Sequence, residues 1–350
     1  MSKTYKQIIA HTISPDFRNS VKIVQTAFPD ALHQNEVLLK NIFVGINASD
    51  VNFVNGKYKP DVQAPFAVGF EAVGEVVEVH KGIDPSVLKA GDHVVSQCYG
   101  SFAEYQVVPH RTIKKIPTCD KHYLPLDLSG TTASISIARV LQPAKGDRAL
   151  VTAAAGGTGS MAVQLLRHQY GCKVIGVCSS EEKEQFLLNE VGCEGVVNYK
   201  KETMRGVPKA VWREFGRICG DEKKKMGPQV VYESVGGELL DRTIDSLALH
   251  GKVLSIGSIS SYTGGWKEDG TGSPLPLQLL SKSASLHTFL LPHFTKHINT
   301  HFRELCALYE KGVIKSFVDE GQPFKGLGSV PDAVDYMYAG KNKGKVIVAL

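Results

Sequence analysis

Long apolar runs are absent from this sequence. No stretch approaches the roughly 20 consecutive apolar residues that a membrane-spanning helix needs, and the N-terminus lacks the apolar core of a secretory signal. The seven cysteines are scattered, and no two of them form a C-x-x-C pair. Dispersed cysteines in odd number indicate free thiols in a reducing compartment. We therefore expect a cytoplasmic protein that does not span a membrane.

A clustered basic surface is also missing. The net charge is +5, and lysines and acidic residues are interspersed along the chain. The one dense basic run, Lys223–Lys225, directly follows Asp221 and Glu222 and is typical of a solvated loop. A nucleic-acid groove needs clustered basic residues interleaved with aromatic ones, so no nucleic-acid partner is expected.

The composition is that of a globular protein with two domains. Apolar residues make up 43% of the 350 residues and charged residues 21%, which is ordinary for a folded chain of this length. Short strand patterns separated by glycine turns up to 128 are typical of a small β-barrel. From 129 onward, apolar strands alternate with helical patterns, which predicts a doubly wound parallel sheet.

The pattern also predicts the individual elements of the second half. Strands are expected at 149–152, 174–177, 196–197, 230–232, 252–256 and 285–290, with helices at 180–191, 239–249 and 297–312. The long charged stretch 205–226 is interpreted as an enlarged surface connection, and the polar segment 45–50 as a turn after an apolar strand. The tail 330–350 predicts a short helix and a last strand.

A glycine-rich turn is the central feature of the second half. An apolar strand at 148–152 leads into it, an amphipathic helix at 161–170 follows, and a second strand comes at 172–178. Glycines let a ligand approach the backbone, and the helix N-terminus offers free N–H groups to a pyrophosphate. The spacing departs from the strict G-x-G-x-x-G form, but the strand–turn–helix context favours a dinucleotide site. The residues concerned are Gly156, Gly157, Thr158 and Gly159.

The end of the second strand indicates which dinucleotide binds. An NAD-specific fold usually has Asp or Glu roughly 20 residues past the glycines, whereas this chain has Ser179 and Ser180 there, with Lys183 one turn later. Hydroxyls and an ammonium group suit a 2′-phosphate, so NADPH is the expected cofactor, held by Ser179 and Lys183. Ser180 also fits a plain helix cap before Glu181, and both interpretations can hold.

Several motifs together resemble the medium-chain dehydrogenase/reductase superfamily and, within it, the zinc-free quinone-oxidoreductase branch. The resemblance covers essentially the whole chain. It implies a GroES-like β-barrel catalytic domain at 1–128 and 313–350, and a Rossmann NADPH-binding domain at 129–312. The motifs are Asn47-x-x-Asp50, Gly69-Phe70-Glu71-x-x-Gly74-x-Val76, Gly91-Asp92-x-Val94, Ala153–Gly159 and Gly340-Lys341-Asn342-x-Gly344-Lys345.

The residue types at two of these positions indicate whether the chain could bind a catalytic zinc ion. Alcohol dehydrogenases of the superfamily hold catalytic zinc with a Cys where this chain has Asn47 and a His where it has Phe70. Phenylalanine does not ligate metals, and an amide is a poor zinc ligand. The four-cysteine structural zinc lobe is missing as well. The sequence therefore predicts no bound metal.

The resemblance implies NADPH-dependent reduction of the C=C bond of α,β-unsaturated ketones, with 15-oxo-prostaglandins as expected substrates (a 13-reductase activity). Hydride addition to such a ketone builds an enolate, which needs hydrogen-bond donors and then a proton. Tyr262 ranks first as donor, Asn47 second and Tyr58 third. Each has a structural alternative: Asn47 as a turn residue, and either tyrosine as a packing residue with a solvated hydroxyl.

Further cofactor contacts follow from the resemblance. They lie where the strands of a doubly wound sheet end, which is where such sheets bind ligands. By residue type alone, Ile256 and Phe289 suit plain strand core equally well. The expected cofactor residues are Tyr199, Ser234, Ile256, Tyr262, Phe289, Leu290, Leu291 and Asn342, beside those of the glycine turn and Ser179 and Lys183.

The sequence is consistent with three functions: the enone reductase, an NADPH quinone oxidoreductase, and a non-catalytic NADPH-binding protein. The loop 260–273 is expected to shape the substrate pocket. Relatives commonly form homodimers through an edge strand, and 285–290 is the candidate here. The resemblance also admits a peroxisomal location, although the terminal Val348-Ala349-Leu350 is not a plain peroxisomal signal.

Overall fold

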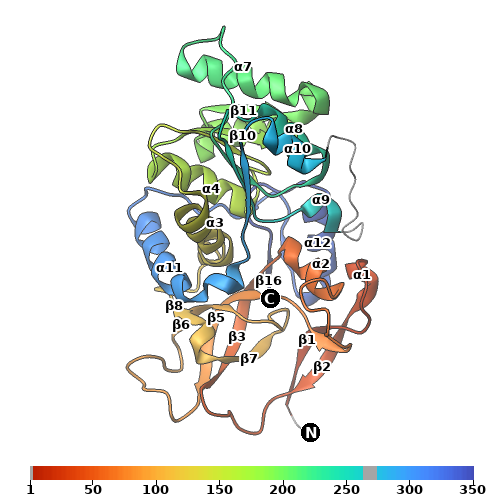
Figure 1. The fold of residues 1–350 in the computed structure, drawn as a ribbon. Helices are drawn as coiled ribbons and strands as arrows, with labels where there is room; N and C mark the ends of the chain where they lie inside the picture. The colour runs from red at the N-terminus through yellow and green to blue at the C-terminus, as the bar shows by residue number, and fades with distance from the viewer. Residues whose placement is uncertain (1–2, 263–273) are drawn as a thin grey trace. The chain divides into compact units, whose positions relative to one another are not determined.

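The computed structural model describes residues 3–262 and 274–350, and it divides into two compact units (Figure 1). The first, here called the barrel unit, consists of Met1–Leu128 and Val318–Leu350. The second, here called the sheet unit, consists of Ser129–Phe317. The tail of the barrel unit thus begins at Val318, whereas the family resemblance led us to expect it from 313.

The sheet unit is built on six parallel strands in the order β11-β10-β9-β12-β13-β14. Leu150, Ile175, Val231 and Val253 in the inner strands are fully buried, as expected for a parallel sheet covered on both faces. All six predicted strands are confirmed to within two residues at each end. They are β9 (Arg148–Val151), β10 (Lys173–Cys178), β11 (Gly195–Asn198), β12 (Val230–Glu233), β13 (Lys252–Ser255) and β14 (Ser285–Thr288).

Helices cover both faces of this sheet, with α3 and α4 on one side and α8 and α10 on the other (Figure 1). The helices are α3 (Thr131–Ser136), α4 (Gly157–His168), α5 (Glu181–Phe186), α6 (Tyr199–Glu202), α7 (Val207–Cys219), α8 (Gly237–Ser246), α9 (Ile259–Tyr262), α10 (Leu275–Leu280) and α11 (Thr295–Glu310). Short π or 3₁₀ turns are η2 (Pro125–Gly130), η3 (Ile137–Leu141), η4 (Leu187–Val191), η5 (Met204–Gly206) and η6 (Leu291–Phe294).

Helix α7 corrects the interpretation of 205–226 as a surface connection. Val207, Val211 and Phe215 of α7 are fully buried in the core beside the sheet. Their spacing places them on one face of a helix. Pro208 lies in the first turn and Gly220 ends the helix in the left-handed conformation, which are normal start and stop signals. The high charge belongs to the opposite, solvated face.

The barrel unit is antiparallel except for its last strand pair. A seven-stranded sheet runs β15-β16-β3-β5-β6-β8, with β7 paired to β3, and a second sheet runs β2-β1-β4. The strands are β1 (Thr4–Ala10), β2 (Val21–Ala27), β3 (Glu36–Gly45), β4 (Phe66–Ala67), β5 (Glu71–Val79), β6 (His93–Gln97), β7 (Tyr105–Pro109), β8 (Ile113–Lys115), β15 (Phe324–Lys325) and β16 (Ile347–Ala349). The expected series of short strands is present.

Short helices α1 (Phe17–Ser20), α2 (Ala48–Val54) and α12 (Val330–Tyr338), with turns η1 (His110–Thr112) and η7 (Leu327–Ser329), complete this unit. Helix α2 stands where the sequence pattern predicted only a polar turn. The backbone N–H of Asn47 donates to Asp50 Oδ2 over 2.8 Å, so the two residues form part of a capping box. The prediction was wrong because the same polar residues favour turns and helix caps alike.

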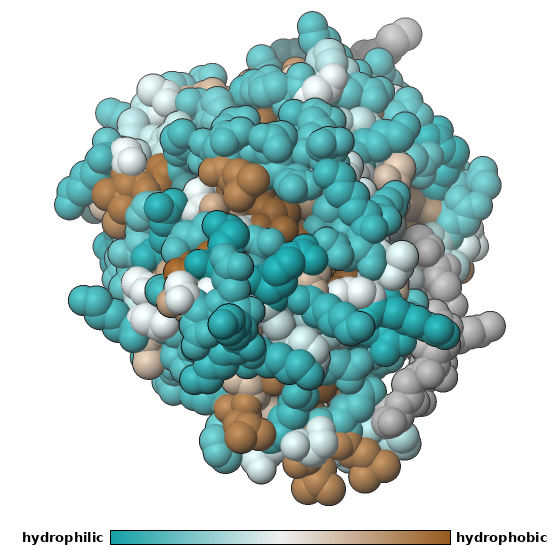
Figure 2. All heavy atoms as spheres, turned by 90° about the horizontal axis from the view of Figure 1, so that it is seen from above, coloured by the Kyte–Doolittle hydropathy of each residue, from teal (hydrophilic) through white to brown (hydrophobic). Residues whose placement is uncertain are grey.

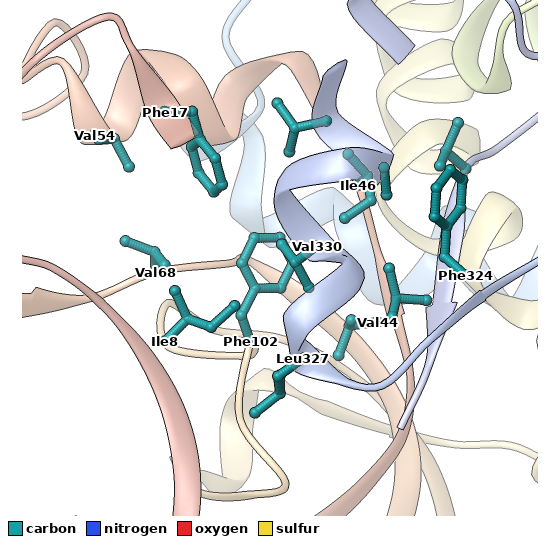
Figure 3. Packing of buried hydrophobic residues seen from close by; sticks show 14 of the residues in the cluster. Ile8, Phe17, Val44, Ile46, Val54, Val68, Phe102, Phe324, Leu327 and Val330 are labelled. Carbon is teal, nitrogen blue, oxygen red and sulfur yellow. The ribbon is translucent and has the colours of Figure 1, made fainter. Parts of the chain in front are cut away.

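The C-terminal tail joins the barrel unit through a shared apolar core (Figure 3). Val330 of α12 and Phe324 of β15 pack with Val44, Ile46 and Phe102 from the first 128 residues. Val44, Phe102 and Val330 are fully buried, and each such side chain contributes about 1.5–3 kcal/mol. The predicted helix and last strand of the tail are present, and packing explains why the tail belongs to this unit. None of the helices described is long and apolar enough to cross a membrane.

Candidate functional site

The glycine turn after β9 is shaped for close approach of an anion. Ala153 adopts a left-handed conformation with φ of 45°, and a Cβ on Gly159 would lie 2.3 Å from the Ala153 carbonyl oxygen. Only glycine fits there. Helix α4 begins at Gly157, so the N–H groups of its first turn have no acceptor within the helix. The residues present therefore fit a pyrophosphate at the positive end of a 12-residue helix.

Most of the predicted cofactor residues lie at one edge of the sheet unit. Every pair of neighbouring strands in this sheet is parallel, so the carboxyl ends of all six strands lie on the same edge. One or more of the predicted residues lie in the segment that follows the last residue of each strand from β9 to β14. These are Gly156–Gly159, Ser179 with Lys183, Tyr199, Ser234, Ile256, and Phe289–Leu291. Sequence reasoning thus gathered residues that the fold does bring to one edge.

The residues after β10 are consistent with both interpretations made from the sequence, a helix cap and a phosphate-binding site. Ser180 caps α5, because its hydroxyl oxygen accepts from the Lys183 N–H at 3.3 Å. Ser179 is half-buried, and so is Lys183. The first turn of α5 also carries Glu181, Glu182 and Glu184, but no carboxylate stands at the strand end itself. The local chemistry suits a 2′-phosphate on Ser179 and Lys183.

A buried carboxyl at the end of β12 was missed from the sequence. Glu233 is fully buried, and its Oε1 accepts from the N–H groups of Val235 at 2.7 Å and Gly236 at 2.9 Å. Thr152 Oγ1 lies 3.3 Å from the same oxygen, and it accepts in turn from the Ser234 N–H at 2.9 Å. Burial raises the pKa of Glu233 to about 7. This carboxyl fixes the turn that leads from β12 into α8, next to the glycine turn.

The remaining predicted residues of the sheet unit differ in how far their side chains are buried. Tyr262 is buried, and its Oη accepts from the Ser258 N–H at 2.9 Å. Phe289 is buried with its ring stacked on Phe294 at 4.6 Å, whereas Leu290 is 42% exposed. Tyr262 therefore has a structural role in holding α9 to the residue that precedes it. Of the loop 260–273, residues 263–273 lie outside the described part of the chain.

In the barrel unit, Asn47 belongs to a network of buried charges. Its Nδ2 donates to Glu71 Oε1 at 2.9 Å and makes a weaker contact with the Gly45 carbonyl at 3.4 Å. Its Oδ1 accepts from Lys345 Nζ, which also forms an ion pair with Glu71. Glu71 is fully buried, and Lys345 is 3% exposed. Both amide hydrogens are thus engaged, so donation to a substrate oxygen would require Asn47 to break one of these bonds.

Asp50 lies beside this network, and its carboxyl forms no ion pair with any residue that the structure describes. It is 3% exposed, and its Oδ2 accepts from the Asn47 N–H. Burial is the main cause that raises its pKa to about 7, and the neighbouring Glu71 carboxylate adds to the shift. Lys345 acts in the opposite direction but is the smaller effect. An acid with such a pKa holds or releases a proton near neutrality.

An aromatic group stands close to Asp50. The Tyr99 ring stacks on Phe53 at 3.9 Å and tilts against Phe70 at 4.7 Å. Burial, with Asp50 and Tyr58 as lesser causes, raises the pKa of Tyr99 to about 12, so its hydroxyl stays protonated. Tyr58 is half-buried, and its N–H donates to the Asn52 carbonyl. The structure thus brings Asn47 and Tyr58 into one region of the barrel unit.

The same region carries the positions relevant to zinc. Phe70 lies in the aromatic group, and Asn47 Oδ1 is bonded to a lysine. Throughout residues 3–262 and 274–350, no group of three or more His, Cys, Asp or Glu side chains is arranged to hold a metal ion. Asn342, predicted from the tail, is 9% exposed and donates from Nδ2 to the Gly344 carbonyl at 2.8 Å.

Four residues of these networks were not singled out from the sequence as site residues: Asp50, Glu71, Lys345 and Glu233. Three of them stand inside the motifs Asn47-x-x-Asp50, Gly69-Phe70-Glu71 and Gly344-Lys345. The available signal was an ionisable residue inside a motif that carries the family resemblance. Glu233 likewise directly follows the buried run of β12.

Comparison with protein families gives two matches. The alcohol dehydrogenase GroES-like domain matches residues 33–118, and the zinc-binding dehydrogenase family matches residues 157–300. The first lies in the barrel unit and the second in the sheet unit.

Curated relatives match over nearly the full chain. A probable quinone oxidoreductase of Leishmania amazonensis is 42% identical over 99% of this chain and 98% of its own length. Prostaglandin reductase-3 of Mus musculus is 40% identical over 99% of this chain and 90% of its own length.

Solved structures share the fold. A mycobacterial protein complexed with NADPH has a TM-score of 0.82 and 27% identity, covering 99% of this chain and all of that one. The Escherichia coli quinone oxidoreductase complexed with NADPH has a TM-score of 0.81 and 25% identity, with the same coverage.

Proposed function

The chain belongs to the medium-chain dehydrogenase/reductase superfamily, and from this premise we propose that it is an NADPH-dependent reductase of the C=C bond of α,β-unsaturated ketones. Its architecture is a GroES-like barrel and a Rossmann-type sheet, matching a mycobacterial protein and the Escherichia coli quinone oxidoreductase, both complexed with NADPH. The broader assignment, an NADPH-dependent oxidoreductase, follows from the relatives along the whole chain.

One observation carries the cofactor assignment. The glycine turn leads into the N-terminus of α4, and β10 is followed by Ser179 and Ser180 with Lys183 a turn later. NADPH, when bound, supplies a hydride. The chain supplies the pyrophosphate site on α4 and hydroxyl and ammonium groups for the 2′-phosphate. The tail residue Asn342 and the loop residues Tyr262 and Phe289–Leu291 are proposed as further contacts.

The choice of an enone rests on the barrel unit. Asn47 and Phe70 stand where alcohol dehydrogenases of the superfamily carry zinc ligands, and here they bind Lys345 and pack on Tyr99. A metal-free site with hydrogen-bond donors suits an enolate. We propose 15-oxo-prostaglandins as substrates because the relatives include prostaglandin reductase-3 of two mammals, at 40% and 41% identity.

A quinone reductase is the second candidate, favoured by the probable quinone oxidoreductase at 42% identity. It shares every cofactor residue, so turnover separates the two functions. Purified protein is given NADPH with a 15-oxo-prostaglandin, a simple enone or a quinone, and cofactor oxidation is followed. Faster turnover of the enones supports the proposal, faster quinone turnover supports the alternative, and NADPH binding without any turnover supports a non-catalytic binding protein.

We further propose that the protein is a homodimer of the cytoplasm. Strand β14 is an edge of the six-stranded sheet, and an edge strand presents unpaired backbone groups to a second copy. The resemblance to prostaglandin reductase-3 keeps a peroxisomal location as the alternative, which fluorescence microscopy of the tagged protein would distinguish.

A further inference from the structure

The Glu233 carboxyl of the sheet unit forms no ion pair with any residue that the structure describes. Glu233 is fully buried at the end of β12. Its Oε1 accepts from the N–H groups of Val235 and Gly236 at 2.7 and 2.9 Å, whereas its Oε2 has no hydrogen-bond partner among the described residues. Because an unpaired charge is costly to bury, a proton on Oε2 removes the charge while Oε1 keeps its bonds.

No other group in the segments packed against Glu233 ionises near neutrality. Burial is the main cause that raises the pKa of Glu233 to about 7, against the smaller effects of the surrounding N–H groups and the Thr152 hydroxyl. Strand β12 lies between β9 and β13, and the segments 149–166 and 253–261 that contain these neighbours have no ionisable side chain.

The titratable groups beside these segments are engaged elsewhere. Tyr232 of β12 is fully buried, and burial raises its pKa, so its hydroxyl stays protonated. Glu238 in the first turn of α8 pairs with Arg242 at 3.3 Å, and Tyr262 at the end of α9 accepts from the Ser258 N–H. A proton exchanged near pH 7 beside the glycine turn therefore belongs to the β12 carboxyl.

Contacts lead from this carboxyl to the proposed pyrophosphate site. Glu233 Oε1 lies 3.3 Å from Thr152 Oγ1 at the end of β9, and the same hydroxyl oxygen accepts from the Ser234 N–H at 2.9 Å. The next residue of the chain, Ala153, opens the glycine turn in a left-handed conformation, and Gly159 of the first turn of α4 packs against its carbonyl group. The carboxyl is thus joined to the N-terminus of α4 through two consecutive residues of β9 and the turn.

The same carboxyl holds the turn that follows β12. With the Val235 N–H bound to Glu233, the carbonyl groups of this turn accept from α9: Ser234 from the Ile259 N–H at 3.2 Å, and Val235 from the Ser260 N–H at 3.0 Å. Ser260 Oγ also donates to the Val235 carbonyl at 2.6 Å. Glu233 therefore positions segments that carry predicted cofactor contacts.

We propose that Glu233 is a positioning residue of the NADPH site and that its carboxyl takes up a proton from solvent when NADPH binds. The inference rests on the proposed placement of the NADPH pyrophosphate on the glycine turn. A bound pyrophosphate adds negative charge close to the buried carboxylate, and like charges repel more strongly in the protein interior than in water. An O–H bond formed at Oε2 removes this repulsion and leaves the bonds of Oε1 in place. One proton is consumed, and the cofactor is unchanged.

The proton uptake gives cofactor affinity a definite pH dependence. The bound anion raises the pKa of Glu233 above its value of about 7 in the free chain, so the complex holds more protons than the free chain between the two values. Affinity therefore falls as pH rises through this range. We expect roughly a tenfold loss, equivalent to a pKa that is higher by about one in the complex, most of it between about pH 6.5 and about pH 9.

Calorimetry measures the proton uptake directly. NADPH is titrated into the protein at about pH 7.5 in two buffers of different ionisation enthalpy, and wild type should take up about half a proton per NADPH. The 2′-phosphate contributes little, because phosphate monoesters titrate near pH 6. Glu233→Gln, which keeps an oxygen for the two N–H groups of the turn, should take up none. The exposed Glu190→Gln should match wild type.

The pH profile of the NADPH dissociation constant separates this role from a purely structural one. Glu233→Gln, which resembles the protonated acid, should bind NADPH equally well at about pH 6.5 and about pH 9, whereas wild type and Glu190→Gln should weaken roughly tenfold. Equal profiles for wild type and Glu233→Gln, or a wild type that takes up no proton, would overturn the inference, and the wild-type measurement needs no variant. If wild type binds no NADPH at any pH, the cofactor site itself fails, and the inference fails with it.

Discussion

Lys183 follows the serine pair at the end of β10 by one helical turn, and we propose that its ammonium group binds the 2′-phosphate of NADPH. Lys183→Ala should weaken NADPH binding by about 1–3 kcal/mol, the scale of a charge-assisted hydrogen bond. NADH, which lacks that phosphate, should change little. Calorimetry with both cofactors measures the difference, and the exposed Lys209→Ala is the control. Equal losses for NADPH and NADH would refute the assignment.

Glu233 links stability to pH. Its pKa is about 7 in the folded chain and about 4.3 in an unfolded one, so the folded state binds more protons between these values. The free energy of unfolding should therefore fall as pH rises from about 4 to about 7, by at most about 3–4 kcal/mol from this group. Asp50, with its similarly raised pKa, adds a fall of the same sign.

Glu233→Gln tests this linkage by removing one part of the slope. Urea midpoints from pH 4 to pH 8 should vary less for the variant than for wild type, while the exposed Glu190→Gln should follow wild type. A variant with the full wild-type slope would show that Glu233 titrates normally in the folded chain.

At single positions, residue type indicated the tight geometry of the glycine turn but not the buried ion pairs of the barrel unit. Gly159 can be recognised because a close backbone approach excludes every other residue. Lys345 cannot, because it is separated by 274 positions from Glu71 in the chain, and only the pairing of β16 with β3 and of β3 with β5 brings the two together. Sequence spacing carries no sign of such an ion pair.

Helix α7 is the element that sequence periodicity should have identified. Its apolar residues recur at helical spacing, but charges between them drew the interpretation toward a loop. Phe215 is fully buried beside the sheet, so Phe215→Ala should lower the free energy of unfolding by about 3–5 kcal/mol.

Chemical denaturation measures this loss directly. Arg213→Ala, on the solvated face of the same helix with an exposed pair to Glu202, should change stability by less than about 1 kcal/mol. Similar small effects for both variants would mean that α7 is the surface connection first expected.

Across the whole molecule, the sequence predicted both architectures because strand and helix periods differ so clearly between the two halves. What it could not give is the set of exposed side chains along the sheet edge. Helix α10 packs the partly buried Leu275 and Leu279 against the core and leaves Leu277 and Leu280 exposed, at 56% and 73%. Figure 2 shows one face on which such hydrophobic residues form separate patches among hydrophilic ones.

The homodimer can be tested at this edge. Helix α10 directly precedes β14, so Leu280→Lys should weaken a dimer formed there, through the loss of apolar burial and through charge repulsion between copies. Sedimentation should show a dimer for wild type and a larger monomer fraction for the variant. Ile13→Lys, an exposed site in the barrel unit, should leave the dimer intact. A monomeric wild type would contradict the proposal.

The central claim is that this chain reduces the C=C bond of an enone with NADPH and without a metal. The most direct measurement mixes chelator-treated protein with NADPH and a 15-oxo-prostaglandin, follows NADPH absorbance, and identifies the product by mass spectrometry. We expect NADPH consumption with one C=C bond reduced per cofactor oxidised, unaffected by the chelator. Unchanged NADPH absorbance with every enone tried, or activity that appears only after zinc is added, would contradict it.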